Sequence, residues 1–282
     1  MLGWALVDLA VIAAAWAAMA LTPPVLMPLW VLVVAGRLHA LGVLAHELVH
    51  QPQRRWPVLQ VLVAYPVLTT VRAMRYHHLR HHRHARMPGD PYLKAVLAGR
   101  PALRPLYWLR GLGMAPLLVL RPPLGLLAWA LPGLRTAYGR VFLLDVSSQS
   151  LRDSPEVLAC SRAELGQLAF LVAVGSLAAV WPWAVLWGYA VPALVAGSVA
   201  TVRLLGEHPD VRAADHSLEA VLASTRDQGL GVLGTVLLAP HHIGFHVAHH
   251  LHPTAGMAHL PALRTWYRDR HPRLYGDRAP IR

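Results

Sequence analysis

Three histidine clusters at helical spacing constrain this chain more than any other feature. They are H-E-L-V-H at 46–50, H-L-R-H-H at 78–82 and H-V-A-H-H at 246–250. On an α-helix, residues three or four positions apart share one face, so each cluster presents its imidazoles in a single direction. The pattern H-x-x-H-H occurs twice in a chain rich in apolar residues. The sequence therefore predicts a metal site assembled from several helices.

The composition is that of an integral membrane protein. Hydrophobic residues fill 55% of the 282 positions and charged residues only 14%, whereas soluble domains carry about 25% charged residues. The formal net charge is +12, and Lys94 is the one lysine among 26 basic residues. The arginines flank apolar segments, so we attribute the charge to cytoplasmic loops and anionic headgroups, and we expect no nucleic-acid partner.

Four segments are long and apolar enough to cross a bilayer, which takes a helix of about 20 residues. We expect these helices at 2–21, 25–48, 164–181 and 183–205. Pro182, which lies between two tryptophans, predicts a tight turn at the aromatic belt of the membrane. Asp8 in the first helix is expected to lie near the headgroups or to pair with Arg37.

Two further apolar segments, 58–74 and 112–131, are predicted not to cross. The second contains three prolines, with Arg121 at its centre, which argues against a straight spanning helix. Ligands of one metal centre must reach the same face of the membrane, so an even number of crossings must separate any two clusters. Both segments are therefore expected to be interfacial or re-entrant, which leaves four crossings.

The distribution of arginine predicts which side of the membrane carries the clusters. The turns at 22–24 and at Pro182 carry no charge, whereas 51–55, 72–86 and 203–226 are rich in arginine. Basic loops remain in the cytoplasm, so the clusters and both termini are expected there. The predicted fold is a single all-α membrane domain over residues 1–282. It has four transmembrane helices, interfacial or re-entrant helices, and a cytosolic helical cap that holds a histidine-ligated di-metal site.

The histidines outnumber the ligands that a single ion uses. His208 directly follows the fourth predicted crossing and raises the count from the three clusters to nine, if 78/81/82 is the set used in the second cluster. One zinc takes three or four protein ligands, so nine imidazoles indicate two ions, and imidazole alone does not select the metal. The triple 77/81/84 is also one-faced, but 78/81/82 repeats the spacing of the third cluster. His242 is placed to hydrogen-bond His246, and His39 is expected to pack or contact water.

Two other classes of protein remain as alternatives. His46-Glu47-Leu48-Val49-His50 matches the H-E-x-x-H motif of zinc proteases, with Asp145 as a conceivable third ligand. That assignment leaves both H-x-x-H-H clusters unexplained. A metal transporter or storage protein would need polar residues along a path through the membrane, and the predicted spans carry few.

At these residues the sequence resembles the membrane fatty acid desaturase/hydroxylase superfamily. The likeness rests on the three-box pattern H-x-x-x-H, H-x-x-H-H, H-x-x-H-H and extends from His46 to about Pro261. Gly206-Glu207-His208, Pro240-His241-His242 and His249-His250-Leu251-His252-Pro253 add local similarity. The first box has Glu47 where many relatives have aspartate, which resembles the alkane hydroxylase version, and Ala248 stands where a glutamate is common.

The resemblance implies a di-iron site and its ligands. The family's ligand positions carry over to His46, His50, His78, His81, His82, His208, His246, His249 and His250. Asp90 corresponds to the acidic residue that often follows the second box. With Glu47, Glu207 and His242 it completes the residues expected to support the ligands. The resemblance, not the spacing, identifies the cofactor as two non-haem iron ions, with dioxygen as co-substrate.

The implied activity is oxidation of a fatty acyl chain held in a membrane, with desaturation favoured over hydroxylation. A carotenoid ketolase or hydroxylase, or an alkane hydroxylase, would use the same ligands. The substrate is expected to be a lipid or an acyl chain on a carrier. We expect no electron-carrier domain after the last box, so the electrons are expected from a separate ferredoxin, rubredoxin or cytochrome b5-like donor.

Overall fold

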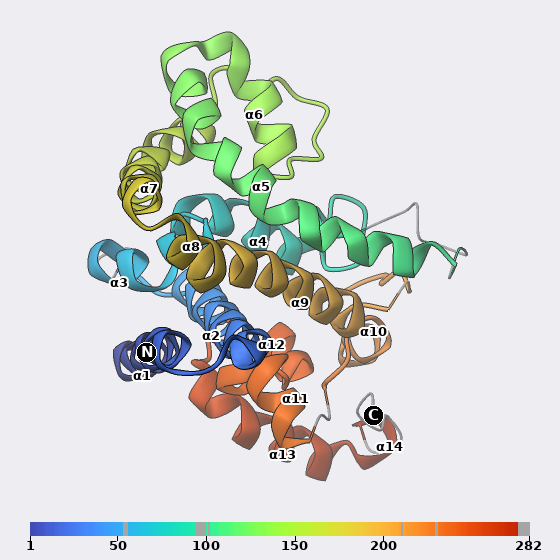
Figure 1. Ribbon diagram of the computed structural model, residues 1–282. Coiled ribbons are helices and arrows are strands. Elements are labelled where there is room, and N and C mark those ends of the chain that lie inside the picture. Colours follow the sequence, from blue (N-terminus) through green and yellow to red (C-terminus); the bar gives the residue numbers. More distant parts are fainter. Residues whose placement is uncertain (53–55, 94–99, 101, 210, 229–230, 276–282) are drawn as a thin grey trace.

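The chain folds into helices joined by short turns, as seen in a computed structural model (Figure 1) that describes residues 1–52, 56–93, 100, 102–209, 211–228 and 231–275. No β-strand occurs in these ranges, which confirms the all-α prediction. The basic stretch 51–55 lies partly outside them. The α-helices are α1 (Leu2–Leu21), α2 (Met27–Leu48), α3 (Trp56–Val63), α4 (Val71–His84), α5 (Leu103–Ala130), α6 (Arg135–Phe142), α7 (Pro155–Val180), α8 (Pro182–Val185), α9 (Val191–Glu207), α10 (Leu218–Ser224), α11 (Val232–Leu237), α12 (His246–Leu251), α13 (Leu260–Arg270) and α14 (Pro272–Tyr275). The short 3-10 and π segments are η1 (Pro24–Leu26), η3 (Tyr65–Val67), η5 (Pro132–Leu134), η6 (Leu186–Ala190), η7 (Pro240–His242) and η8 (Met257–His259).

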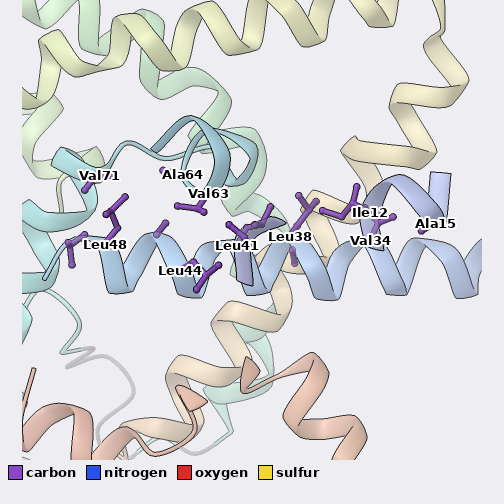
Figure 2. Close-up of a cluster of buried hydrophobic side chains, with 14 residues drawn as sticks. Ile12, Ala15, Val34, Leu38, Leu41, Leu44, Leu48, Val63, Ala64 and Val71 are labelled. Carbon is purple, nitrogen blue, oxygen red and sulfur yellow. The ribbon is translucent and has the colours of Figure 1, made fainter. Parts of the chain in front are cut away.

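The first helical hairpin supplies the main apolar core. α1 coincides with the predicted span 2–21, and η1 with α2 covers the predicted span 25–48. Figure 2 shows the row of buried side chains along α2, including Leu38, Leu41 and Leu44, which pack toward α1 and α3. This packing fixes α2, and therefore the first histidine cluster at its end, against its neighbours.

A second helical hairpin, formed by α7 and by α8 with α9, returns the chain to the histidine clusters. α7 ends at Val180, Trp181 makes the turn, and Pro182 begins α8 with its ring at a position where a helix needs no backbone N–H. The helix then continues through η6 into α9 and ends at Glu207. α7 begins at Pro155, nine positions before the predicted 164, because Ser154 caps it by accepting a hydrogen bond from Val157 N (3.3 Å).

The segment 112–131, predicted not to form a straight spanning helix, lies almost wholly within one continuous but bent helix, α5 (Figure 1). α5 contains Pro116, Pro122 and Pro123 and still runs to Ala130. Figure 1 shows that α5 bends along its length, as expected where prolines remove hydrogen bonds to the preceding turn. Packing along α9 and α7 compensates for the lost bonds. A Cβ on Gly111 would lie 2.6 Å from Ser198 Cα, so the α5–α9 approach requires glycine there.

Five helices among the described residues are long and apolar enough to cross a membrane, one more than predicted. The additional one covers Pro105–Ala130 within α5. In contrast, the segment 58–74 is divided between α3, η3 and the start of α4. The eight residues of α3 extend about 12 Å, well short of a hydrocarbon core about 30 Å thick.

Two ion pairs are buried among the apolar helices. Arg37 Nη1 donates to Asp8 Oδ1 (2.9 Å), which is the pairing expected from the sequence. Arg121 of α5 pairs with Glu164 of α7 at 2.9 Å between Nε and Oε1, and both side chains are at most 2% exposed. Tyr138 OH also donates to Glu164 Oε1 (2.8 Å). This cluster ties α6 and the bent α5 to α7.

Replacing Glu164 by alanine is expected to destabilise the protein strongly, because it leaves the Arg121 guanidinium buried without its counter-ion. Breaking a buried pair on one side costs about 3–5 kcal/mol, whereas exchanging both partners for apolar residues is often neutral. The thermal unfolding midpoint in detergent should therefore fall in Glu164→Ala and recover in Arg121→Met/Glu164→Met. Equal midpoints for wild type and Glu164→Ala would show that the pair contributes nothing.

Candidate metal centre

Histidines from four helical regions converge on one place in the fold. They come from the end of α2, from α4, from the residue after α9 and from α12. The first group of ring nitrogens, all within 4.8 Å of one another, belongs to His46, His50, His78, His82 and His249. The second group, within the same limit, belongs to His81, His208 and His250. His246 adjoins the second group, with its Nε2 3.1 Å from His208 Nε2 and 3.2 Å from His250 Nε2.

The two groups lie side by side. The ring centroids of His82 and His250, one from each group, are 4.6 Å apart. Within the groups, Nε2–Nε2 distances include 3.0 Å for His50–His78, 3.0 Å for His82–His249 and 3.2 Å for His81–His208. All nine predicted ligand histidines therefore meet in two adjacent sets of ring nitrogens.

Local sequence determines how the helices present these rings. Thr70 caps α4 by accepting a hydrogen bond from Ala73 N (3.2 Å), so the helix begins at Val71, seven positions before His78. Within α4, His78 and His82 are one turn apart and both face the first group, while His81 faces the second. His50 lies just past the end of α2, where Arg75 of α4 donates to the Val49 carbonyl.

Burial favours the neutral form of eight of these imidazoles. Burial first, and then the nearby Arg75 guanidinium, lower the pKa of His50 to about 4. The pKa values of His78, His208 and His249 lie well below their usual range, first because of burial and then because of neighbouring histidines. Neutral imidazole is the form that binds metal ions. The site thus presents neutral ligands at physiological pH.

The arrangement fits metal ions. If the outer nitrogens carry the protons, neutral Nε2 lone pairs face one another at about 3 Å, and a cation between them turns repulsion into binding. Two nitrogens at about 2.1 Å from one ion and at right angles to each other are about 3 Å apart, which matches the observed spacing. Nine nitrogens in two adjacent groups provide for two ions.

Carboxylates support the second group. His81 Nδ1 donates to Asp90 Oδ1 (2.8 Å), which directs the His81 Nε2 lone pair toward His208. Burial raises the pKa of Asp90, but the bonds from His81 and from the Arg86 and Tyr92 amides outweigh it and hold that pKa below its usual value. Glu207 accepts from Arg203 Nη1 (2.7 Å) and lies 3.5 Å from His246 Nε2. Asp90 and Glu207 thus lie beside ligand histidines, as expected from the sequence.

The other two expected supporting residues lie elsewhere. Glu47 accepts from Gln51 Nε2 (3.2 Å) and belongs to neither group of ring nitrogens. Its helical position turns it away from the face that carries His46 and His50. His242 stacks on Phe245 and meets the Trp4 ring edge-on, and no bond to His246 is found among the described residues. His242 ends η7 with a left-handed backbone (φ 67°), and residues 243–245 lie between it and α12, so its ring and that of His246 are not on one helical face.

Histidines that were weighed against the chosen set also have separate partners. His77 bonds the Tyr92 hydroxyl through Nδ1 (2.6 Å), and His39 bonds the Leu238 carbonyl through Nε2 (3.1 Å). Neither belongs to a group that could hold a metal, and the same is true of His84. Asp145, the conceivable third ligand of a protease site, instead accepts a hydrogen bond from Tyr76 OH (2.6 Å).

Asp227 supports the third cluster, although nothing in the sequence singled it out. Its Oδ1 accepts from Val247 N (2.9 Å), in the first turn of α12. Its Oδ2 accepts from Arg264 Nε (3.0 Å) and Tyr275 OH (2.9 Å). One carboxylate thus caps α12 from a distance and joins it to α13 and α14. Tyr92 is another residue beside the histidines that the sequence did not single out. The centroid of its ring lies 4.4 Å from that of His81.

Comparison with known proteins identifies the family. The model of the family described as "Fatty acid desaturase" matches residues 22–279. The chain belongs to the fatty acid desaturase family. A comparison with curated proteins gives no significant match. Membership indicates a membrane oxidoreductase of the desaturase/hydroxylase type, and the histidine groups described above agree with the metal dependence typical of this family.

Replacing Asp90 by asparagine is expected to weaken metal binding about 10–100-fold, the usual effect of losing a carboxylate behind a histidine ligand. The loss should be seen when the purified protein competes with a chelator for its metal. His259→Ala serves as the control, because His259 is exposed and outside both groups. If the two variants retain metal equally well, Asp90 does not support a ligand.

Replacing Asp227 by alanine should loosen α12 and reduce both thermal stability and metal content. The change leaves donors from Val247, Arg264 and Tyr275 without their acceptor, at about 1–3 kcal/mol for each buried group left unpaired. Asp269→Ala is the matched control, because Asp269 pairs only at the surface with Arg268. A metal content equal to that of Asp269→Ala would contradict the positioning role.

Proposed function

We propose that this desaturase-family protein introduces a double bond into a fatty acyl chain with dioxygen and two iron ions. The observation that carries the proposal is the convergence of nine buried or half-buried imidazoles from four separate helical regions. They belong to a chain whose apolar helices fit a membrane protein. A zinc protease needs only three of these side chains, and its proposed third ligand faces elsewhere.

In this proposal all nine histidines hold the cofactor, five around one ion and four around the other. Bound iron ions with dioxygen and two electrons supply an oxidant strong enough to take hydrogen from an unactivated methylene. The protein's part is to fix the ions through His46, His81 and the other ligands, and to exclude water. Asp90 holds His81 in the tautomer that leaves Nε2 free for metal.

The geometry supports a topology of four crossings. Three long apolar helices, α5, α7 and α8–α9, separate the second cluster from His208. His81 and His208 meet at 3.2 Å, so an even number of these three helices crosses completely. α7 and α9 are joined by a turn at Trp181 and form the crossing pair, which leaves the bent α5 as a helix that does not cross.

Charge supports a cytosolic position for the centre. The arginine-rich segments 72–86 and 203–226 adjoin the histidine groups, whereas the turns at the far ends of both hairpins are uncharged. Half-buried His50, His82 and His250 form the most exposed edge of the centre. Electrons are proposed to come from a separate ferredoxin, rubredoxin or cytochrome b5-like donor that approaches on this side.

Cells that express the wild-type chain should accumulate an acyl chain that lacks two hydrogens, detected by mass spectrometry of total lipids. His81→Ala should abolish the product, because it removes one ligand and the contact with Asp90, whereas the exposed His259→Ala should retain it. A product that has gained one oxygen would instead assign hydroxylation to the same centre. No change in lipids with either chain, in cells that supply the electron donor, would contradict oxidation of an acyl chain.

A further inference from the structure

Part of the segment between His208 and the third cluster packs along α2 and then returns. Gln228 N donates to the Gly244 carbonyl (2.9 Å), which closes the segment at its base. Between these points, α11 packs against α2, and a Cβ on Gly36 would lie 2.8 Å from Leu237 Cδ2. The base of this segment is thus near the histidines, and its far end is near the middle of α2.

The contacts with α2 indicate how far the end of α11 lies from the metal centre, measured along the axis of α2. α2 has 22 residues and is therefore about 33 Å long, comparable to the hydrocarbon core of a bilayer. Arg37 lies nine residues before His46, about 14 Å along the helix axis. Arg37 Nη2 donates to the Val236 carbonyl at 2.5 Å. The C-terminal end of α11 therefore lies well below the level of the metal centre.

Backbone groups at this depth are satisfied by protein donors. Irregular backbone inside a membrane is tolerated only where protein or water satisfies its polar groups. The carbonyls of Val236 and Leu238, at the end of α11, accept from Arg37 and from His39 Nε2 (3.1 Å). Polar side chains of α2 thus supply the donors that a helix ending within the membrane requires.

A buried acid fixes the return of the segment. His241, in η7, donates through Nε2 to Asp8 Oδ2 (2.7 Å), and Asp8 itself is fully buried in α1. The ring of Trp4 stacks on His241 with centroids 4.9 Å apart. His241 and His242 both have positive φ, at 54° and 67°, a strained conformation for non-glycine residues. These contacts hold the strained turn against α1 and α2.

The outer face of α11 is apolar. Val232 is 82% exposed, Leu233 78% and Val236 45%. Such side chains face lipid where the element lies at membrane depth, and α1 and α2 beside it expose large apolar residues in the same way, including Leu6 and Leu32. Because α11 packs against the middle of α2, the occupant that fits its outer face is the acyl chains of the bilayer.

We propose that residues 231–244 form a re-entrant hairpin whose α11 face is immersed in the hydrocarbon of the bilayer, and that Asp8, Arg37 and His39 hold it there. The hairpin ends two residues before His246, so one edge of the third cluster is anchored inside the membrane. The inference is independent of the bound metal and of the reaction, since it rests on the depth of α2 and on the contacts made to it.

Spin labels at α11 test the depth directly. Leu233→Cys and Val232→Cys, each in a Cys160→Ala background, carry a nitroxide in phosphatidylcholine bilayers, and relaxation by oxygen is compared with relaxation by a water-soluble nickel chelate. Val172→Cys in α7 is the lipid reference and Val211→Cys, after α9, is the aqueous reference; these two residues are 60% and 44% exposed. Labels at 232 and 233 should match position 172, with high oxygen and low nickel accessibility. Values that match position 211 would overturn the proposal.

A second arm tests what holds the hairpin. Asp8→Ala combined with Leu233→Cys should raise the nickel accessibility at position 233 several-fold, because His241 and Arg37 lose their common acceptor. Asp269→Ala in the same background should leave it unchanged. If Asp8→Ala has no effect on a label that is otherwise inaccessible to nickel, the anchoring role of Asp8 is wrong while the immersion of α11 stands.

Discussion

The fold depends on keeping nine imidazoles together in one largely buried place. Lone pairs that face one another at about 3 Å repel unless a cation lies between them. Burial removes the alternative of protonation, as the lowered pKa values of His50, His82 and His250 show. The helices must therefore be held rigidly enough to keep these rings in place, and much of the remaining structure is explained by this requirement.

The supporting contacts come from every part of the chain. Thr70 sets the start of α4, Asp227 caps α12 from a distance, and Asp90 orients His81. The Arg121–Glu164 pair joins the bent α5 to α7. Each is a polar group whose desolvation is offset by a specific partner, so each positions an element more precisely than apolar packing alone.

Periodicity predicted that the histidines of each cluster point the same way, and they do come together, because histidines at i, i+3 and i+4 share a face whatever the rest of the fold does. Asp90 and Glu207 were also found, since they adjoin ligands in the sequence. Asp227 was missed because it acts twenty residues away from Val247, through a contact that only the tertiary fold creates. The prolines indicated that α5 would not be straight, and it is bent, but they did not show that it stays continuous, because its packing on α7 and α9 is a tertiary contact.

The polar residues within the first hairpin illustrate the same limit. The sequence indicated that Asp8 would pair with Arg37, and it does. It did not show that His241 and the Val236 carbonyl share these partners, because 199 residues separate Arg37 from Val236. Four polar groups from three distant segments thus pair with one another. In the proposed hairpin, they connect the third histidine cluster to the membrane.

The most direct measurement is the identity and number of metal ions in the purified chain, combined with X-ray absorption at the metal edge. The proposed function predicts two iron ions per chain, each surrounded by imidazole nitrogen. A single zinc ion per chain, or iron bound mainly through oxygen or sulfur, would contradict it.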